Sequence, residues 1–228
     1  MDSGKVQAEQ SPSVPVPRID PFQELTDRYE SWFETYEAAY ESEIEALRSL
    51  HPAGGRGLEI GVGTGRFAEP LDIAFGVDPA REMLETARDR GISVTRGVAE
   101  ALPYRDDSFD SALIVTTICF VDDVDQTIRE AARVLGPGGN LLLGYIDKES
   151  RVGRRYQEIK DENPFYRDAR FVSTAELIRG LETIGFVDIE IRQTIFQMPE
   201  EMDGPDPVRG GFGDGSFVAL RGTWPGDE

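Results

Sequence analysis

The sequence predicts an α/β protein built around a mostly parallel β-sheet with helices on both faces. Three observations lead to this fold class. Short apolar segments alternate with helical segments from about residue 55 onward, a glycine-rich turn follows the first apolar segment, and an acid, Asp78, ends the second. This alternation favours a parallel sheet, because each connecting helix returns the chain to the same end of the sheet. With 228 residues, the chain is long enough for one domain with a substantial core.

The N-terminal part contains two different segments. Residues 1–20 are rich in serine and proline and are predicted to be a disordered tail, which leaves 21–228 as a single domain. A helix is predicted from Phe22 to Leu50, where a proline and glycines at 51–55 end it. Its aromatic residues lie three or four positions apart and therefore share one face. They are Tyr29, Trp32, Phe33, Tyr36 and Tyr40.

After that helix, strands and helices are predicted to alternate. Residues 55–61 and 72–78 have the apolar pattern of strands, and a short helix is predicted between them at 66–71. The next helix, 79–91, has proline in its first turn and glycine at its end, which are the positions these residues prefer. Residues 92–97 follow as a short strand.

The longest apolar segments lie in the middle of the chain. Residues 108–120 and 140–147 are nearly continuous apolar runs, as is typical of central strands that are buried on both faces. An amphipathic helix is predicted between them at 122–136, ending at a Gly-Pro-Gly-Gly sequence.

The C-terminal part is predicted to complete the sheet. A polar helical stretch covers about 150–163, and a helix at 173–185 begins with a Ser and a Glu spaced as in a capping box. Strands are predicted at 186–196 and 215–222. Because no helix separates these two strands, we expect them to form an antiparallel pair at one edge of the sheet.

The composition limits the classes of partner. The chain has 24 Lys and Arg against 43 Asp and Glu, a formal net charge of −19. A general nucleic-acid binder needs a basic face, so no nucleic-acid partner is expected. No apolar run is long enough to cross a bilayer and no signal-peptide pattern begins the chain, so we expect no membrane partner and a cytoplasmic location. The acidity fits either a salt-adapted cytoplasm or a GC-rich genome.

Cysteine and histidine each occur once, as Cys119 and His51. One cysteine cannot form an intrachain disulfide or a multi-thiolate metal site, and no metal site is predicted. A mechanism that needs a histidine would have to use His51, which lies at the far end of the first predicted helix.

The glycine turn and Asp78 together indicate a cofactor that contains a nucleoside. In an open α/β sheet, ligands bind beyond the carboxyl ends of the strands. Gly61, Gly63 and Gly65 permit a close approach to the main chain there. Asp78 ends the neighbouring strand, where its carboxylate is placed to accept hydrogen bonds from both hydroxyls of a ribose, although capping of the helix that begins near Pro79 is a compatible role.

Two cofactor classes compete for this turn. A dinucleotide site requires Gly-x-Gly-x-x-Gly, whereas this chain has Gly-x-Gly-x-Gly preceded by Glu59. A carboxylate close to the cofactor repels a pyrophosphate and attracts a cation. S-adenosylmethionine carries a sulfonium and an ammonium group, and the acid fits it better.

Four separated segments give the chain its resemblance to a known family. They are LEIGVGTG at 58–65, GVDP at 76–79, GVAEALPYRDDSFD at 97–110 and REAARVLGPGGNLLLG at 129–144. Over roughly residues 55–147, the chain resembles the class I S-adenosylmethionine-dependent methyltransferases, of the broad small-molecule group that is similar to type 11. The resemblance implies a Rossmann-like sheet of seven strands.

The resemblance also implies a set of cofactor contacts. Glu59 and Gly61 would lie near the methionine part, Asp78 at the ribose, and Ala99 and Glu100 near the adenine. The other residues expected to bind the cofactor are Gly63, Gly65, Pro79 and Thr116. The chain departs from the family at Val98, where an aspartate often binds the adenine amino group.

The expected activity is transfer of a methyl group from S-adenosylmethionine to a small-molecule acceptor by in-line displacement. The family often has two histidines after the fourth strand, and this chain has Cys119 and Phe120 there. Correct placement of the reactants alone contributes about 7–11 kcal/mol. Where a proton must leave the acceptor, the candidate catalytic residues are Asp122, Asp147 and Tyr36.

Two segments are candidates for the acceptor side. The aromatic face of residues 21–50 either packs this segment onto the domain or forms a helical lid that excludes water from the reaction. Residues 148–172 are expected to be a helical insertion near the substrate pocket. Its cations suggest an anionic acceptor, and nearby acids offer them local ion pairs instead. The cations are Arg151, Arg154, Arg155, Lys160, Arg167 and Arg170.

Alternatives from other functional classes remain open. A non-catalytic regulatory subunit that binds S-adenosylmethionine and activates a partner would have the same cofactor motifs without needing a base. A nicotinamide oxidoreductase is disfavoured by the glycine spacing. The sequence leaves the acceptor unnamed and is compatible with either a monomer or a homodimer.

Overall fold

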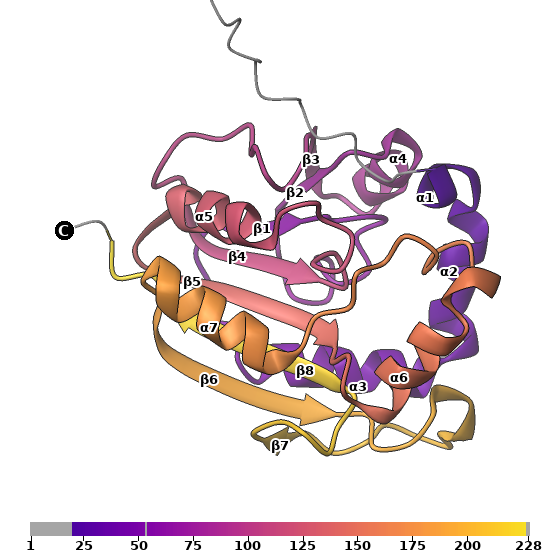
Figure 1. Ribbon diagram of the computed structural model, residues 1–228. Coiled ribbons are helices and arrows are strands. Elements are labelled where there is room, and N and C mark those ends of the chain that lie inside the picture. Colours follow the sequence, from indigo (N-terminus) through magenta and orange to yellow (C-terminus); the bar gives the residue numbers. More distant parts are fainter. Residues whose placement is uncertain (1–19, 53, 227–228) are drawn as a thin grey trace, which may run out of the picture.

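A computed structural model describes residues 20–52 and 54–226 and contains one mixed sheet (Figure 1). Its strands, in spatial order, are β3, β2, β1, β4, β5, β8, β6 and β7. The predicted tail lies outside the described residues, except that Asp20 begins the first helix. The strands are β1 Gly57–Ile60, β2 Phe75–Asp78, β3 Ser93–Arg96, β4 Phe109–Val115, β5 Leu135–Ile146, β6 Val187–Thr194, β7 Arg209–Gly210 and β8 Phe217–Thr223.

The predicted fold class is confirmed, with one more strand than expected. Neighbouring strands from β3 to β5 are parallel, and β8 runs antiparallel to both β5 and β6. The predicted antiparallel pairing of the last two long strands is therefore found at one edge of the sheet, and β8 lies between β5 and β6. The prediction of seven strands is wrong, because the two residues of β7 pair with the end of β6 and add an eighth. So short a strand carries no apolar pattern that the sequence would reveal.

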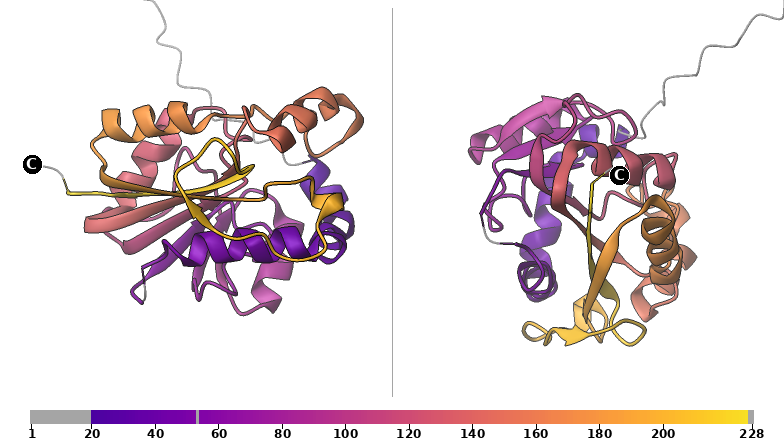
Figure 2. Two further views of the ribbon diagram at one scale, coloured as in Figure 1. Left: turned by 90° about the horizontal axis from the view of Figure 1, so that it is seen from below. Right: turned by 90° about the vertical axis from the view of Figure 1, so that its left-hand side faces the viewer.

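Helices cover both faces of the sheet and one of its ends. The α-helices are α1 Asp20–Glu24, α2 Thr26–Thr35, α3 Glu37–Arg48, α4 Arg81–Asp89, α5 Val124–Val134, α6 Arg151–Glu158 and α7 Thr174–Ile184. Short 3₁₀ helices are η1 Lys160–Glu162 and η2 Pro199–Glu201. In Figure 2, α5 and α7 lie on one face of the sheet and α3 and α4 on the other.

The core follows the two-residue period of the central strands. Leu113 and Val115 of β4 pack in the cluster that contains α3 and α4, whereas Ala112 and Ile114 pack in the cluster that contains α5 and α7. Because successive side chains point to opposite faces, a strand covered on both faces is apolar at every position. This explains the continuous apolar run that the sequence shows there.

Two helix predictions are wrong in detail. The first predicted helix, from 22 to 50, is three helices, because Leu25 and Tyr36 have non-helical ψ angles of 33° and 45°. Residues 66–71, expected to be a helix, form a series of turns. Pro70 lies near the end of that six-residue segment, where it disfavours helical geometry for the residue before it. The breaks at Leu25 and Tyr36 leave the three- and four-residue spacing of the aromatic residues unchanged, so the sequence pattern does not reveal them.

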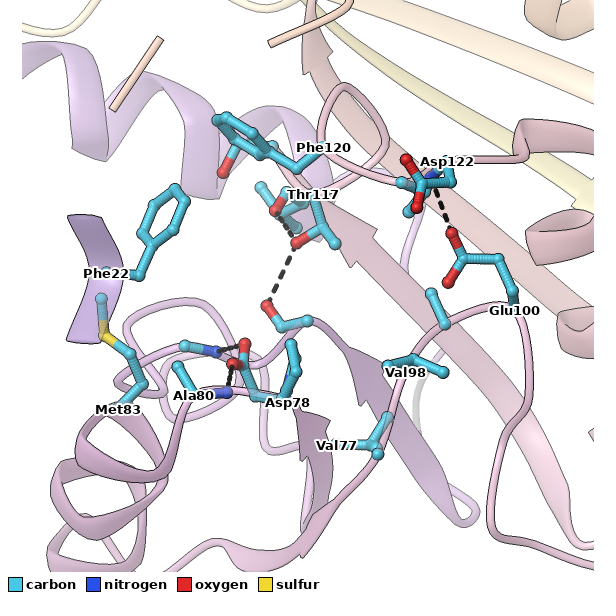
Figure 3. A pocket seen from close by; sticks show the side chains of 18 of the residues that line it. Phe22, Val77, Asp78, Ala80, Met83, Val98, Glu100, Thr117, Phe120 and Asp122 are labelled. Atoms are coloured by element: carbon cyan, nitrogen blue, oxygen red, sulfur yellow. Dashed lines mark hydrogen bonds between the residues drawn. The ribbon is translucent and has the colours of Figure 1, made fainter. Parts of the chain in front are cut away.

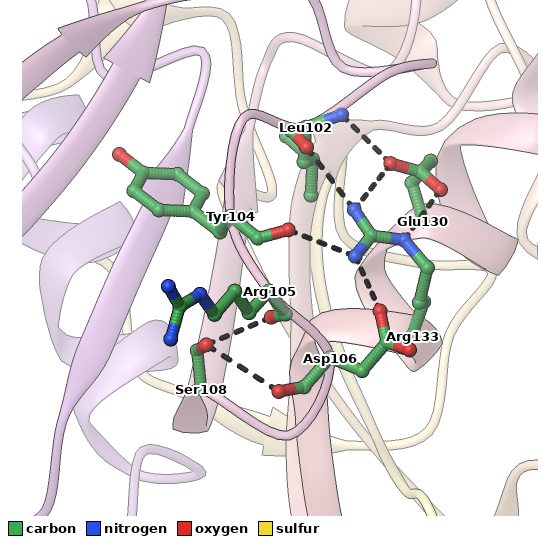
Figure 4. Close-up of polar contacts among 7 residues, drawn as sticks. All are labelled: Leu102, Tyr104, Arg105, Asp106, Ser108, Glu130 and Arg133. Carbon is green, nitrogen blue, oxygen red and sulfur yellow. Dashed lines mark hydrogen bonds and ion pairs between the residues drawn. The ribbon is translucent and has the colours of Figure 1, made fainter.

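Helix ends and one ion-pair network hold the connections in place. The predicted capping box at the start of α7 is confirmed. The side chain of Ser173 accepts a hydrogen bond from the Glu176 N–H, and the side chain of Glu176 accepts one from the Ser173 N–H. Figure 4 shows Arg133 of α5 donating to the carbonyls of Leu102 and Tyr104, at 3.1 and 2.9 Å. Arg133 also pairs with the carboxylates of Glu130 and Asp106, at 2.8 and 2.7 Å.

This network fixes the loop between β3 and β4 against α5. Glu130 accepts a hydrogen bond from the Leu102 N–H at 2.7 Å, and its pairing with Arg133 holds its pKa below the usual range. Charge-assisted hydrogen bonds therefore hold both a backbone N–H and two backbone carbonyls of this loop.

We expect Arg133→Ala to lower the free energy of unfolding by about 1–3 kcal/mol, because it leaves two carbonyls and two carboxylates without their donor. The matched control is Arg129→Ala, an exposed arginine of the same helix, which should change it by less than about 0.5 kcal/mol. Equilibrium denaturation in urea measures both. Equal effects of the two substitutions would contradict the structural role of Arg133.

Candidate cofactor and acceptor site

The glycine turn lies at the carboxyl end of β1. Gly61 has a φ of 74°, a left-handed conformation that favours glycine. A Cβ added to Gly61 would lie 2.2 Å from Oγ1 of Thr117, so any larger residue would displace that side chain. Gly65 differs, since an added Cβ would meet Ile92 at 2.3 Å inside the core. Gly61 thus shapes the cleft, and Gly65 allows close packing behind it.

Asp78 fixes this turn from the neighbouring strand (Figure 3). Its Oδ2 accepts a hydrogen bond from the Gly63 N–H at 3.0 Å, and its Oδ1 accepts one from the Ala80 N–H at 2.8 Å. Burial raises the pKa of Asp78 to about 6, and the two backbone hydrogen bonds oppose that shift. One carboxylate therefore joins the glycine turn of β1 to the start of α4.

A cleft opens beside Asp78 and collects most of the predicted cofactor residues. It runs along the ends of β1, β2 and β4, and Phe22 and Tyr29 of the N-terminal helices form its opposite side. Glu59 and Gly65 do not line this cleft. The predicted residues that line it are Gly61, Gly63, Asp78, Pro79, Ala99, Glu100 and Thr116.

Glu59 lies behind the glycine turn and is almost completely buried, with 1% of its surface exposed. Among the described residues, no group forms a hydrogen bond with its Oε2. Burial raises the pKa of Glu59 well above the usual range, against the effect of a backbone hydrogen bond from Ala68. A buried carboxyl oxygen without a partner, next to a bare main-chain turn and a second acid, fits a cofactor that carries positive charge.

The far end of the cleft has a different character. Oε1 of Glu100 accepts a hydrogen bond from the Asp122 N–H at 2.7 Å, so this carboxylate ties the loop after β3 to the loop after β4. Val98 lines the cleft with an apolar side chain at the position where the resembling family often has an aspartate. The walls at this end are therefore largely apolar, as suits the face of a base.

A second cavity, of about 610 Å³, lies beside the cleft. Phe22, Tyr29, Thr116 and Phe120 line both spaces. The walls of the second cavity are mainly aromatic and come from the N-terminal helices and from the segment around α6. They include Trp32, Phe33, Tyr36, Tyr156, Phe165 and Tyr166. We call this space the acceptor cavity.

Thr116, at the junction of the two spaces, has a strained backbone. Its φ is 53°, a value that β-branched residues rarely adopt. Its N–H donates to the Gly144 carbonyl at 2.7 Å, which holds the conformation in place. Strain of this kind persists only where the surroundings enforce it, and it is concentrated at functional sites.

The three candidate catalytic residues have different positions. Asp122 lines the cleft and Tyr36 lines the acceptor cavity. Asp147 lines neither space. Its carboxylate is buried and accepts hydrogen bonds from the Glu149 N–H and from both the N–H and the hydroxyl of Thr174. Asp147 therefore connects the end of β5 to the start of α7, and the structure does not bring it to the other two candidates.

An ion-pair cluster attaches α2 to the glycine turn. Glu30 of α2 pairs with Arg66 at 2.7 Å and with Arg90 at 2.6 Å. Arg90 also donates to the carbonyl of Thr64 at 2.5 Å. These side chains are about one-fifth exposed, so water screens them less than it screens surface pairs.

The cations of 148–172 are mostly directed to local partners. Of the six that the sequence singled out, Arg155 alone lines the acceptor cavity. Arg151, Arg154 and Arg155 pair with Glu201, Glu149 and Glu158 at the surface. Ion pairing, which was expected as one alternative, is therefore present for these three arginines, and Glu158 is the partner among them that the sequence suggested.

Sequence reasoning missed Glu43. This residue of α3 is 3% exposed and lines the acceptor cavity. A signal was available, because Glu43 follows Tyr36 and Tyr40 at helical spacing and so falls on the aromatic face. A carboxylate on an apolar face requires an explanation. His51 lines neither space, and the described part of the chain has no helix long and apolar enough to cross a membrane.

Comparison with known proteins also indicates a methyltransferase. Residues 58–143 match the model of a family described as a methyltransferase domain. A protein of uncharacterised function from Methanocaldococcus jannaschii is 45% identical over 199 residues, 87% of this chain and 96% of that protein. A malonyl-[acyl-carrier protein] O-methyltransferase from Methylococcus capsulatus is 32% identical over 157 residues, 58% of this chain and 56% of that protein.

Among solved structures, one from Thermotoga maritima is described as an S-adenosylmethionine-dependent methyltransferase and possible histamine N-methyltransferase. It is 48% identical, with a TM-score of 0.88, and the match covers 90% of this chain and 99% of that one. The motifs, the eight-stranded fold and these matches agree. This chain belongs to the class I S-adenosylmethionine-dependent methyltransferases, in the type 11 group.

Proposed function

We propose that this protein transfers a methyl group from S-adenosylmethionine to a small molecule held in the acceptor cavity. The observation that carries this proposal is the junction of the two spaces. Phe22, Tyr29, Thr116 and Phe120 line both the cleft with the cofactor residues and the aromatic cavity of about 610 Å³. That volume lies within the roughly 300–1,000 Å³ of small-molecule sites.

The residues of the cleft have separate roles in this proposal. The turn at Gly61 would hold the positively charged methionine part, with Glu59 acting on it from behind the turn. Asp78 would hold the ribose, and Ala99 and Glu100 the adenine end. Pro79, Gly63 and Thr116 complete the walls. The bound cofactor supplies an activated methyl group, which passes to a lone pair of the acceptor by in-line displacement while the sulfur keeps the electrons of the broken bond.

In this proposal, the site acts mainly by positioning the two reactants, because the described side chains that line it offer no strong general base. Burial raises the pKa of the Cys119 thiol to about 12, so this side chain stays protonated. Burial and nearby acids raise the pKa of Tyr29 as well. The proton that leaves the acceptor would go to Asp122 or Tyr36, or to water, and positioning would supply most of the rate enhancement.

The N-terminal helices act in this proposal as a lid. Phe22 of α1 and Tyr29 of α2 close the side of the cleft, which encloses about 100 Å³. Small-molecule sites usually have roughly 300–1,000 Å³. The helices α1 and α2 would therefore move outward while the cofactor binds, and would then close and exclude water from the transfer. The Glu30 pairs with Arg66 and Arg90 would hold the closed position.

A non-catalytic subunit that binds the same cofactor is the second candidate. The absence of histidines after β4 is compatible with it. A large cavity that shares four lining residues with the cofactor cleft favours an enzyme, because a regulatory subunit needs no space for an acceptor. The proposal further places the protein in the cytoplasm as a monomer or homodimer, without nucleic-acid or membrane partners.

Turnover and binding measurements test the function together. We expect calorimetry to detect binding of S-adenosylhomocysteine and none of NAD. With methyl-labelled S-adenosylmethionine and a fractionated pool of small metabolites, label should appear in at least one small molecule. Cofactor binding without transfer to any fraction would support the non-catalytic subunit, and binding of NAD alone would refute both.

Affinity for S-adenosylhomocysteine should depend on the charge of Asp78. Ribose hydroxyls donate to the ionised carboxylate, so binding lowers a pKa that is about 6 in the free protein. Affinity should therefore be constant above about pH 7 and fall by up to tenfold per pH unit below 6. Asp78→Asn should weaken binding about tenfold or more at pH 8 and remove the fall in affinity that the wild type shows below pH 6.

The matched control for this profile is Asp89→Asn, an exposed acid at the end of α4 that should retain wild-type affinity and pH dependence. A profile for Asp78→Asn that matches the wild type would refute the role of this carboxylate.

Glu30→Gln should loosen the lid. The substitution removes the charge that pairs with Arg66 and Arg90, so S-adenosylhomocysteine should associate and dissociate several-fold faster, with a smaller change in affinity. Stopped-flow fluorescence measures both rates. Glu41→Gln, at an exposed position of α3, is the control. Unchanged exchange rates would mean that the Glu30 cluster does not control access.

A further inference from the structure

We propose that the acceptor carries a cationic amine or ammonium group, and that this group binds between the carboxylate of Glu43 and the aromatic rings of the acceptor cavity. This inference rests on the proposed methyl transfer and names the substrate class of the same site. It makes Glu43 a residue that determines specificity.

Glu43 is a buried carboxyl for which the described residues provide no partner. It lies on the face of α3 that lines the acceptor cavity, and 3% of its surface is exposed. Across residues 20–52 and 54–226, the structure contains no hydrogen-bond donor or cation paired with this carboxyl, whereas its neighbour Ser42 both donates and accepts. Burying an unpaired carboxyl destabilises a fold, so its position in a cavity wall is explained by a ligand that pairs with it.

Many of the residues that line the cavity with Glu43 are aromatic. The cavity wall contains Trp32, Tyr36, Tyr156 and Tyr166, and the last two rings stack with centroids 4.6 Å apart. Burial raises the pKa of both Tyr156 and Tyr166, so the phenols are neutral, and Glu43 acts electrostatically on each. Aromatic faces attract cations, by about 0.5–2 kcal/mol each. Burial raises the pKa of Glu43 to about 8, so a bound cation would ionise this carboxyl, and one carboxylate among neutral rings is complementary to a single positive charge.

The other charges of the cavity do not offset this preference. Arg28, Arg155 and Glu200 also line it, and all three are exposed to solvent. Arg155 pairs with Glu158, and Arg28 lies over the ring of Phe165 at 5.8 Å. Water weakens the effect of exposed charges far more than that of a buried one. The structure therefore favours a cationic acceptor over the anionic one that the sequence suggested.

The cation site is separate from the position of methyl transfer. Glu43 lines the acceptor cavity and is not among the residues that line the cofactor cleft. An acceptor whose cation contacts Glu43 would thus be held by one end, with the rest of the molecule extending toward Phe22 and Tyr29. Glu43 would orient the acceptor and take no part in the displacement.

Fluorescence of Trp32 gives a direct test of binding. The chain has two tryptophans, and the other, Trp224, follows β8 and packs against Phe186 beside the start of β5, at the edge of the sheet opposite the carboxyl ends of the parallel strands. In a Trp224→Phe background saturated with S-adenosylhomocysteine, Trp32 in the cavity wall reports ligand entry. The probes are benzyltrimethylammonium, 2-phenylethanol and phenylacetate, which share a ring and differ in charge.

We expect benzyltrimethylammonium to bind at least tenfold more tightly than the neutral and anionic probes. Glu43→Gln, which keeps the size of the side chain, should remove about tenfold of that affinity and leave 2-phenylethanol within twofold of its original value. Glu200→Gln, at an exposed position of the same cavity, should change none of the three.

Equal affinity for the three probes, a preference for phenylacetate, or a cation preference that survives Glu43→Gln would each overturn the inference, and so would the absence of any binding. If Glu43→Gln does not fold, the ranking of the three probes on the unsubstituted cavity decides. Failure of the proposed function is distinguishable, because it appears as loss of S-adenosylhomocysteine binding or turnover, whereas failure here leaves both intact.

Discussion

The site depends on one carboxylate that joins two parallel strands at their ends. Asp78 accepts the Gly63 N–H with one oxygen and the Ala80 N–H with the other, so it fixes the glycine turn of β1 against the start of α4. Because both contacts are to the main chain, they determine backbone shape rather than side-chain packing. The cleft, the orphan oxygen of Glu59 and the position of α2 over the turn are all arranged around that shape.

Charge is distributed differently at the surface and in the interior. The formal net charge of −19 arises mostly from exposed acids, many of which pair with arginines and are screened by water. Glu43, Glu59 and Asp78 are the acids to which the proposed function gives binding roles, and burial raises the pKa of each of them. Two of them lie at the cofactor end and one in the acceptor cavity, which provides two separate places for positive charge.

The sequence predictions were accurate for elements that depend on local interactions and less accurate for elements that depend on distant ones. The long strands and α4, α5 and α7 were predicted close to their observed positions, since their periodicity and caps are local properties. The exception is the start of β5, which lies at Leu135 and not at the predicted residue 140. The helix at 66–71 and the unbroken helix at 22–50 were wrong, because Pro70 and single non-helical residues end helices without altering the apolar pattern. The structure has eight strands where seven were predicted, because β7 is defined only by its pairing with β6.

Local sequence patterns were enough to predict the fold class and to select nine candidate cofactor residues, seven of which line one cleft. Those residues follow strand ends, and parallel strands bring their carboxyl ends to one edge whatever the remaining packing is. Three features became visible only once the chain was folded: the acceptor cavity, the role of Asp147 in connecting β5 to α7, and the position of Glu43 without a partner among the described residues. The cavity is assembled from segments more than 100 residues apart, and the environment of a carboxyl depends on which of those segments surround it.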